Sequence, residues 1–181
     1  MIDIKEYYGL ISPRPTVCIS TMSPKGTANL GPYSFVSPVS FDPPVIGVSV
    51  GKGKDTILNA RQTGDFVVIP LTKSWMKEGI RAEISLGRDQ SEFEEIGLKR
   101  RLSKKVKSPG VMEAPVNIEC EYWDEIRVGD HIWLLGKVVH ISAEEGAIHN
   151  GRLNIEELGS VCHVKGEEFC ISECTTTIER D

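Results

Sequence analysis

The residues that decide the fold are VNIECEYWDEIRVGDHIWLLGKVVHIS, at positions 116–142. Two long stretches, 116–127 and 131–142, are rich in β-branched and aromatic side chains, which favour strands. Val128, Gly129 and Asp130 stand between them, and glycine beside aspartate is typical of a tight turn. The segment therefore predicts a long β-hairpin.

Shorter strand patterns lie on both sides of this hairpin. Residues 16–22 form a β-branched run that ends at the turn sequence Ser23-Pro24-Lys25-Gly26. Further strands are predicted at 33–40, 45–50 and 66–71, and near Val161 and Phe169. Proline cannot donate a hydrogen bond to a neighbouring strand. Strand ends, edges or bulges are therefore the expected places of Pro32, Pro38, Pro43 and Pro44.

Two helices are marked by the residues at their ends. Asp55 is the expected N-cap of the first helix, which ends at Gly64. Ser91 opens the second as part of a capping box with Glu94, and this helix ends near Gly97. A further short helix is expected within 75–88. A few helices among many strands predict a mainly β protein, an antiparallel barrel with helical decoration. Residues 1–181 contain no repeat or linker, so one domain is expected.

Charge and composition exclude some classes of protein. Apolar residues make up 40% of the chain and charged residues 26%, a balance typical of globular domains. The net charge of −5 does not fit a general nucleic-acid binder. A basic segment at 99–107 is interpreted as a solvated loop or as a local anion site. No apolar run reaches the roughly 18 residues of a membrane span, and the N-terminus is too charged for a signal peptide. We therefore expect a cytoplasmic protein that binds neither membrane nor nucleic acid.

Cysteine and histidine spacing gives no sign of a metal centre or a nucleophile. The five cysteines include no C-x-x-C pair and are expected to be mostly buried free thiols. A site built from Cys162, Cys170, Cys174 and a histidine would match no common zinc spacing. The four histidines lack i, i+4 pairing, and no Gly-x-Ser-x-Gly motif occurs. We expect no metal and no catalytic side chain.

The segment Gly51-Lys52-Gly53-Lys54-Asp55-Thr56 is the most suggestive local motif. Glycines that precede a helix let backbone N–H groups approach an anion, and the helix N-terminus adds a partial positive charge. The spacing matches neither a Walker A loop nor a Gly-x-Gly-x-x-Gly fingerprint. A flexible turn capped by Asp55 and a phosphate site both remain open on spacing alone.

An ordered set of motifs over roughly residues 10–170 resembles the flavin reductase-like, FMN-binding split-barrel family, which includes flavoredoxins. The matching stretches are Pro13-Arg14-Pro15, Ile19-Ser20-Thr21, Asn29-Leu30-Gly31-Pro32-Tyr33-Ser34-Phe35, Asp42-Pro43-Pro44, Val48-Ser49-Val50, Lys54-Asp55-Thr56, Glu92 to Leu98, Glu119-Cys120, Gly129-Asp130-His131 and Gly136-Lys137-Val138. Two places depart from the family pattern: Gly31 stands where alanine is frequent, and 164–169 carries charges where glycines and an aromatic residue are frequent.

The resemblance implies an antiparallel Greek-key split β-barrel and a homodimer with FMN near its interface. Residues at matching positions would line the isoalloxazine ring or the ribityl chain: Asn29, Gly31, Ser34 and Phe35. Lys54 and Thr56 would hold the phosphate. Support for the ribityl hydroxyls or the phosphate would come from Ser20, Thr21 and Ser49. His131 would approach the ring from the late hairpin, and Arg88 would be a further phosphate or ring contact.

Two functions follow from the resemblance. The first is an NAD(P)H-dependent flavin oxidoreductase, in which hydride passes to flavin N5. The alternative is a non-enzymatic FMN electron carrier that a protein partner such as a ferredoxin reduces. A third class, an OB-fold-like binder of single-stranded nucleic acid, would need a basic groove rich in aromatic residues. Aromatic residues are only 7% of the chain, so Trp75, Trp123 and Trp133 are expected in the core or at a dimer interface.

Overall fold

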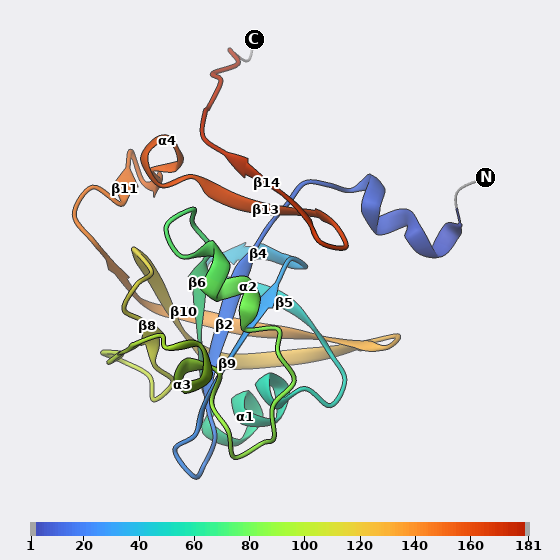
Figure 1. The fold of residues 1–181 in the computed structure, drawn as a ribbon, viewed down its shortest axis with the longest axis vertical. Helices are drawn as coiled ribbons and strands as arrows, with labels where there is room; N and C mark the ends of the chain where they lie inside the picture. Colours follow the sequence, from blue (N-terminus) through green and yellow to red (C-terminus); the bar gives the residue numbers. More distant parts are fainter. Residues whose placement is uncertain (1–2, 180–181) are drawn as a thin grey trace.

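The structure, a computed structural model, describes residues 3–179 and is built around one seven-stranded antiparallel sheet. Its strands, in spatial order, are β3 (Ala28–Tyr33), β2 (Val17–Met22), β6 (Asp65–Pro70), β9 (Val116–Val128), β10 (His131–Ala143), β5 (Pro44–Gly51) and β4 (Val36–Phe41). The sheet curves into a barrel-like body, with β9 and β10 running across it (Figure 1). The mainly β antiparallel fold predicted from the sequence is confirmed.

A second, three-stranded sheet lies at one end of this body. It pairs β1 (Arg14–Pro15) with β13 (Ser160–Lys165) and β13 with β14 (Glu168–Ser172). Two-stranded pieces complete the strands: β7 (Arg100–Arg101) with β8 (Gly110–Val111), and β11 (Ile148–His149) with β12 (Arg152–Leu153). The β13–β14 hairpin and helix α1 (Asp55–Thr63) lie toward opposite ends of the molecule's longest axis (Figure 1).

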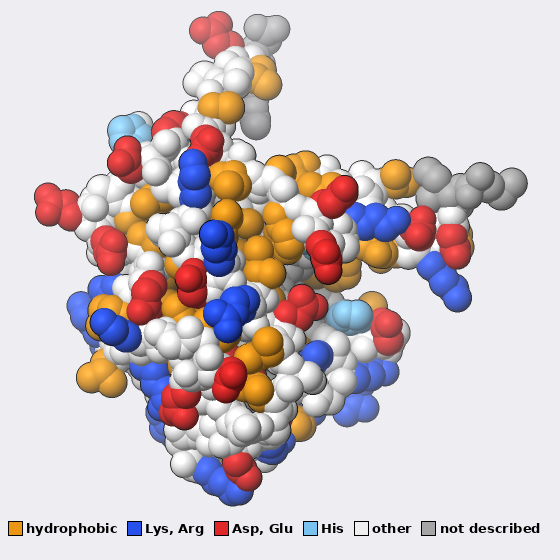
Figure 2. Space-filling model, in the orientation of Figure 1, with side chains coloured by type: hydrophobic (Ala, Val, Ile, Leu, Met, Phe, Trp, Pro, Cys, Tyr) orange, Lys and Arg blue, Asp and Glu red, His pale blue; other side chains and the backbone are white. Residues whose placement is uncertain are grey.

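The other helices are short and border the sheets. They are η1 (Ile4–Leu10), α2 (Met76–Arg81), α3 (Glu92–Ile96) and α4 (Ile155–Leu158). Among the described residues, no helix is long and apolar enough to cross a membrane. On the face that Figure 2 shows, acidic and basic side chains are interspersed, and hydrophobic ones gather over the β13–β14 hairpin.

The two faces of the main sheet support two separate hydrophobic cores. Strand β2 contributes to both, because successive side chains point to opposite faces: Cys18 joins the cluster around Trp75 and Phe93, and Ile19 joins the cluster around Phe66. This burial on both faces explains why 16–22 reads as a nearly continuous apolar and β-branched run rather than as an alternating one.

The long hairpin predicted from 116–142 is confirmed as β9 and β10, in which His131 pairs with Val128. The strand predicted at 33–40 is shorter, because Ser34 and Phe35 separate β3 from β4. Pro38 lies in β4, an edge strand whose register shifts between Pro38 and Ser40, as expected for a proline at an edge or bulge.

The predicted helix ends and the start of α3 at Ser91 are correct, but the predicted side-chain caps do not form. Gly64 and Gly97 end α1 and α3 in the left-handed conformation that glycine adopts without strain. Lys54, not Asp55, is the N-cap of α1, and no side chain caps this helix. The capping box at Ser91 does not form, because its hydroxyl donates at 2.6 Å to the carbonyl of Ala28. A tertiary contact has replaced the local one.

Candidate functional site

Two adjoining hollows form one cleft at the edge of the barrel. The larger, of about 430 Å³, lies between β3, the N-terminal end of α1 and residues 82–86. The smaller, of about 250 Å³, lies between η1, the β3–β4 connection and the β13–β14 hairpin. The two hollows share Pro32, Tyr33, Ser49, Glu83 and His131, so we treat them as a polar half and an aromatic half of one cleft.

The polar half has the donors that an anion needs. Strand β5 ends at Gly51, and Gly53 takes a positive φ of 81° before the chain enters α1. The first N–H groups of an α-helix have no intrahelical acceptor, so those of α1 face outward with a partial positive charge. Lys54 is exposed here and forms no ion pair within residues 3–179. These donors suit a phosphate dianion.

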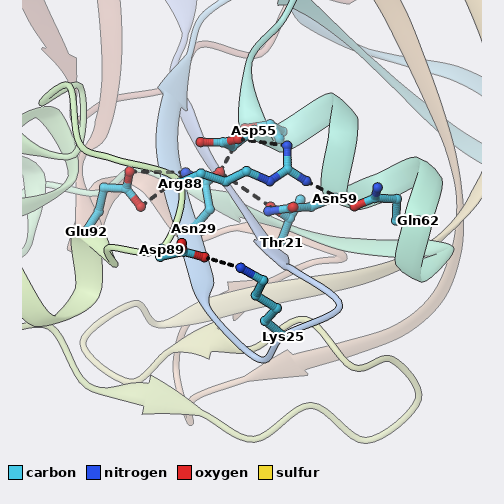
Figure 3. Close-up of polar contacts among 10 residues, drawn as sticks. Thr21, Lys25, Asn29, Asp55, Asn59, Gln62, Arg88, Asp89 and Glu92 are labelled. Carbon is cyan, nitrogen blue, oxygen red and sulfur yellow. Dashed lines mark hydrogen bonds and ion pairs between the residues drawn. The ribbon is translucent and has the colours of Figure 1, made fainter.

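Carboxylates also line the polar half, and two of them already have partners. Asp55 lies 3.5 Å from the guanidinium of Arg88, which also donates to Gln62 at 3.0 Å (Figure 3). Glu92 is turned toward β3, where it accepts hydrogen bonds. The guanidinium of Arg88 offsets the charge of Asp55, so this carboxylate opposes an incoming anion less than a free carboxylate would.

Glu92 holds the side chain of Asn29 in one orientation. The amide nitrogen of Asn29 lies 3.1 Å from each carboxylate oxygen (Figure 3). The backbone N–H of Leu30 donates to one of these oxygens at 3.0 Å. Only 6% of Glu92 is exposed, and this burial raises the pKa of its carboxyl. The amide nitrogen of Asn29 is thereby committed to Glu92.

The amide oxygen of Asn29 accepts from the other side of the cleft. Thr56 donates its hydroxyl to this oxygen at 3.1 Å, and the hydroxyl of Tyr33 lies 2.9 Å from Thr56. Burial raises the pKa of Tyr33 to about 12, so its hydroxyl stays protonated at neutral pH. Strand alternation explains the arrangement. Ala28 and Leu30 enter the core, while Asn29, Gly31 and Tyr33, which alternate with them along β3, line the cleft.

The aromatic half is organised around Arg14. Its guanidinium carbon lies 5.4 Å from the ring centre of Phe35 and 5.8 Å from that of Tyr8. It donates to the carbonyls of Tyr8, Ile11 and Val164, and so joins the N-terminal helix to the C-terminal hairpin. Phe35 is 36% exposed and presents an aromatic surface to the cleft.

His163 continues this network, and its contacts define its tautomer. Nδ1 lies 3.0 Å from the hydroxyl of Ser34 and 3.3 Å from Arg14, and Nε2 lies 2.9 Å from the carbonyl of Gly166. A guanidinium can only donate and a carbonyl can only accept. Nδ1 is therefore the acceptor and Nε2 the donor. The ring of Phe169 packs beside His163, with 4.9 Å between their centres.

The structure brings together most of the site residues that the sequence predicted. Lining the cleft are Asn29, Gly31, Ser34, Phe35, Ser49, Lys54, Thr56 and His131. Their contacts with a cofactor stay predictions.

Three predicted site residues lie outside the cleft lining. Ser20 is wholly buried in β2, and no partner for its hydroxyl lies within the described chain. Thr21 is also buried and reaches the site only through Asn29, at 3.4 Å. Arg88 lines a separate hollow with Asp89 and acts on the site through Asp55. The pleat of β2 turns the side chain of Ser20 into the interior. The ion pair with Asp55 holds the side chain of Arg88 away from the cleft lining.

Sequence reasoning missed other residues of the cleft: Tyr8, Tyr33, Glu83, Glu92, His163 and Phe169. Tyr33 lies within a stretch that matches the family, Asn29 to Phe35, but the resemblance gives it no role. No local pattern pointed to Glu92 or His163, because their partners lie 63 and 129 residues away in the chain.

Comparisons with known proteins agree on one family. A family model described as "Flavin reductase like domain" matches residues 10–156. An uncharacterised protein of Halalkalibacterium halodurans is 31% identical, over 91% of this chain and 86% of its own length. The uncharacterised protein YwrF of Bacillus subtilis is 31% identical, over 93% of this chain and 90% of its own.

Solved structures share the fold over nearly the whole chain. Nitrilotriacetate monooxygenase component B from Bacillus cereus has a TM-score of 0.90 at 28% identity, covering 98% of this chain and 95% of its own. Flavoredoxin of Desulfovibrio vulgaris has a TM-score of 0.83 at 20% identity, covering 92% and 90%. These matches confirm the split-barrel fold.

Proposed function

Because the chain belongs to the flavin reductase-like, FMN-binding family, we propose that it is an FMN-dependent oxidoreductase that takes a hydride from NADH or NADPH. One observation carries the proposal: a site with anion donors continues without a break into a cleft lined by aromatic side chains. A flavin nucleotide has the same two parts, a phosphate at one end and a planar ring at the other.

The residues of the cleft fit FMN. The N-terminal end of α1, with Lys54 and the hydroxyl of Thr56, would hold the phosphate. The ring would lie toward Tyr33 and Phe35, against an apolar surface with a few fixed polar groups. Bound FMN would supply the redox chemistry by accepting a hydride at N5.

The chain's own contribution is binding and orientation. Asn29 is held between Glu92 and Thr56 before any ligand arrives, so little ordering is needed on binding. His131 lies in both halves of the cleft, and its Nδ1 is 2.7 Å from the carboxylate of Asp130. A carboxylate only accepts, so Nδ1 carries the proton and donates to it, and in the neutral ring Nε2 is left as an acceptor facing a ligand.

A homodimer is part of this proposal. The outer face of the main sheet places Ile126 opposite Trp133, and Trp133 opposite the cleft residue Ser49. Ile126, Trp123 and Val128 are 53%, 52% and 58% exposed, although all three are large and apolar. An apolar sheet face that continues into a cleft is the kind of surface that a second copy covers. FMN would then lie near the interface.

The second candidate function, an electron carrier, is favoured by one feature of the cleft. Within the described residues, cations are sparse in the aromatic half, where Arg14 already donates to three backbone carbonyls. A nicotinamide nucleotide would thus find few free donors for its pyrophosphate. A protein that donates electrons directly to the flavin would need none.

The first test is the visible absorption of the purified protein. Bands at about 375 and 450 nm, with FMN released on denaturation, are expected of a flavoprotein. A colourless protein that takes up no added FMN would overturn the proposal. Oxidation of NADH or NADPH above background then supports the reductase. Slow reduction by both nucleotides, with fast reduction by a ferredoxin, supports the carrier.

A further inference from the structure

The β13–β14 hairpin carries two cysteines at directly opposed positions. Cys162 pairs with Cys170 in the strand register, and the next pair is His163 with Phe169. Because side chains alternate between faces, the two thiols share one face of the hairpin, while the two rings line the cleft on the other. The thiols therefore lie behind the cleft wall.

This geometry suits a disulfide. Directly opposed residues of an antiparallel pair have Cα atoms about 4.5–5.5 Å apart, and disulfides span about 4.4–6.8 Å. The thiols also lie close enough to affect each other: burial raises the pKa of Cys162, and the neighbouring Cys170 adds to the rise. No large backbone movement is needed to join them.

The other three cysteines do not share this arrangement. Cys18 and Cys120 are buried in different cores, and Cys174 is exposed beyond the end of β14. Cys170 is half-buried, so a small oxidant in solvent reaches it, whereas Cys162 is shielded. The pair thus combines an accessible thiol with a sheltered one in contact with it.

We propose that Cys162 and Cys170 are a redox modification site that forms a reversible disulfide with hydrogen peroxide as the oxidant. The thiol of Cys170 gives up its proton and the thiolate attacks one peroxide oxygen, the O–O bond breaks, and a sulfenic acid forms while the leaving hydroxide takes up that proton as water. The thiol of Cys162 then attacks this sulfur and displaces a second water. Two thiols are oxidised and one peroxide is reduced to two waters.

The consequence is a covalent tie across the hairpin that supports the aromatic half of the cleft. His163, next to Cys162, accepts hydrogen bonds from Arg14 and Ser34, and β13 also pairs with β1. The disulfide would fix this strand pair in its present register. The inference stands whether or not the chain binds FMN, because it rests on the hairpin alone.

The test uses the full chain, reduced and then treated with hydrogen peroxide. Free thiols are alkylated in denaturant and counted by mass spectrometry. Reduced protein should carry five adducts, one for each cysteine, and oxidised protein two fewer. Trypsin cuts after Lys165, so the disulfide joins two peptides that are otherwise separate. Dithiothreitol should restore all five thiols.

Matched variants identify the pair. Cys174→Ser should still form the cross-linked peptide, whereas Cys170→Ser should lose it and leave Cys162 alkylatable. Circular dichroism checks that each variant is folded. The proposal is overturned if Cys174→Ser keeps all its thiols after peroxide, if the bond joins Cys174 instead, or if Cys170 is converted to sulfinic acid without bonding.

Discussion

The carboxylate of Glu92 and the amide of Asn29 meet across the cleft at 3.1 Å, although 63 residues separate them in the chain. Each comes from a different part of the fold, Glu92 from the first turn of α3 and Asn29 from β3. The contact joins a buried acid to the polar half of the proposed FMN site. Because this acid is buried, its titration should be coupled to folding.

The stability of the protein should depend on pH through Glu92. Burial raises the pKa of its carboxyl, so the folded state holds this proton more tightly than the unfolded state. The contribution of Glu92 to the free energy of unfolding therefore falls as the pH rises from the ordinary value of 4.5 through the raised pKa. Glu92→Gln should remove this fall.

Urea denaturation of both proteins between about pH 4 and pH 8 measures the effect. The free energy of unfolding of the wild type, minus that of Glu92→Gln, should decrease as the pH rises. Parallel profiles for the two proteins would show that Glu92 does not titrate differently on folding. Glu95→Gln, in the same helix, is the control.

Lys54 should contribute strongly to FMN affinity. Replacement by glutamine keeps a polar side chain, one atom shorter, and removes the charge next to the N-terminal end of α1. A hydrogen bond to a charged group is worth about 1.5–3 kcal/mol, so we expect a loss of about tenfold to a hundredfold in affinity. Calorimetric titration with FMN measures it.

Lys52→Gln is the matched control, because Lys52 is exposed in the same loop but does not line the cleft. The loss in Lys54→Gln should shrink at high salt, while Lys52→Gln should bind FMN nearly as the wild type does. Equal losses in both variants would indicate a diffuse charge effect rather than a contact.

Gly136 should not tolerate a side chain. A Cβ atom at this position of β10 would lie 2.2 Å from Cζ of Phe66 and 2.9 Å from Cβ of Cys120. Overpacking of this kind typically costs about 1–3 kcal/mol, so Gly136→Ala should unfold at a lower urea concentration. Gly31→Ala is the control, since its Cβ would meet the Tyr33 ring at an ordinary 3.5 Å. Similar midpoints for the two variants would contradict this reading of the core.

Asp65 should be essential for anchoring the basic segment 99–107. Its carboxylate is buried and accepts from the backbone N–H groups of Lys107 and Ser108 at 3.1 and 3.0 Å, and from the Ser108 hydroxyl at 2.6 Å. Asp65→Ala would leave these donors without an acceptor, at a cost of about 3 kcal/mol.

Glu121 faces Asp65 in the strand register but is exposed, so Glu121→Ala should change stability little. Urea denaturation compares the two variants. Limited proteolysis after the lysines of 104–107 should be faster in Asp65→Ala than in Glu121→Ala. Equal cleavage rates would mean that other contacts fix this segment.

Local patterns were enough to predict the long hairpin, β2, β5, β6 and the ends of α1 and α3, but they missed β3, η1 and α4. The hairpin at 116–142 could be predicted because strand propensity and turn formation depend on residues that are close together in the chain. Gly64 and Gly97 marked helix ends because the left-handed conformation is a property of a single residue. The proposed anion site at Lys54 is local in the same way, since a loop and the helix after it are contiguous.

The caps and the cleft wall were decided by tertiary structure. The sequence placed Ser91 in a capping box, but the hydroxyl found the carbonyl of Ala28 instead. Ser20 and Arg88 were both predicted site residues. The pleat of β2 buries the side chain of Ser20, and the ion pair with Asp55 holds Arg88 outside the cleft lining.

The sequence by itself determined the long hairpin, several of the other strands and the ends of α1 and α3, and it left a phosphate site and a plain turn before α1 both open. Only the tertiary structure brought Glu92 to Asn29, His163 to Ser34 and Cys162 to Cys170. Strand propensity, turns and helix ends depend on neighbouring residues, so a linear reading finds them. Contacts across the cleft depend on which strands pair and in what register, and this is settled by burying both faces of the sheet together.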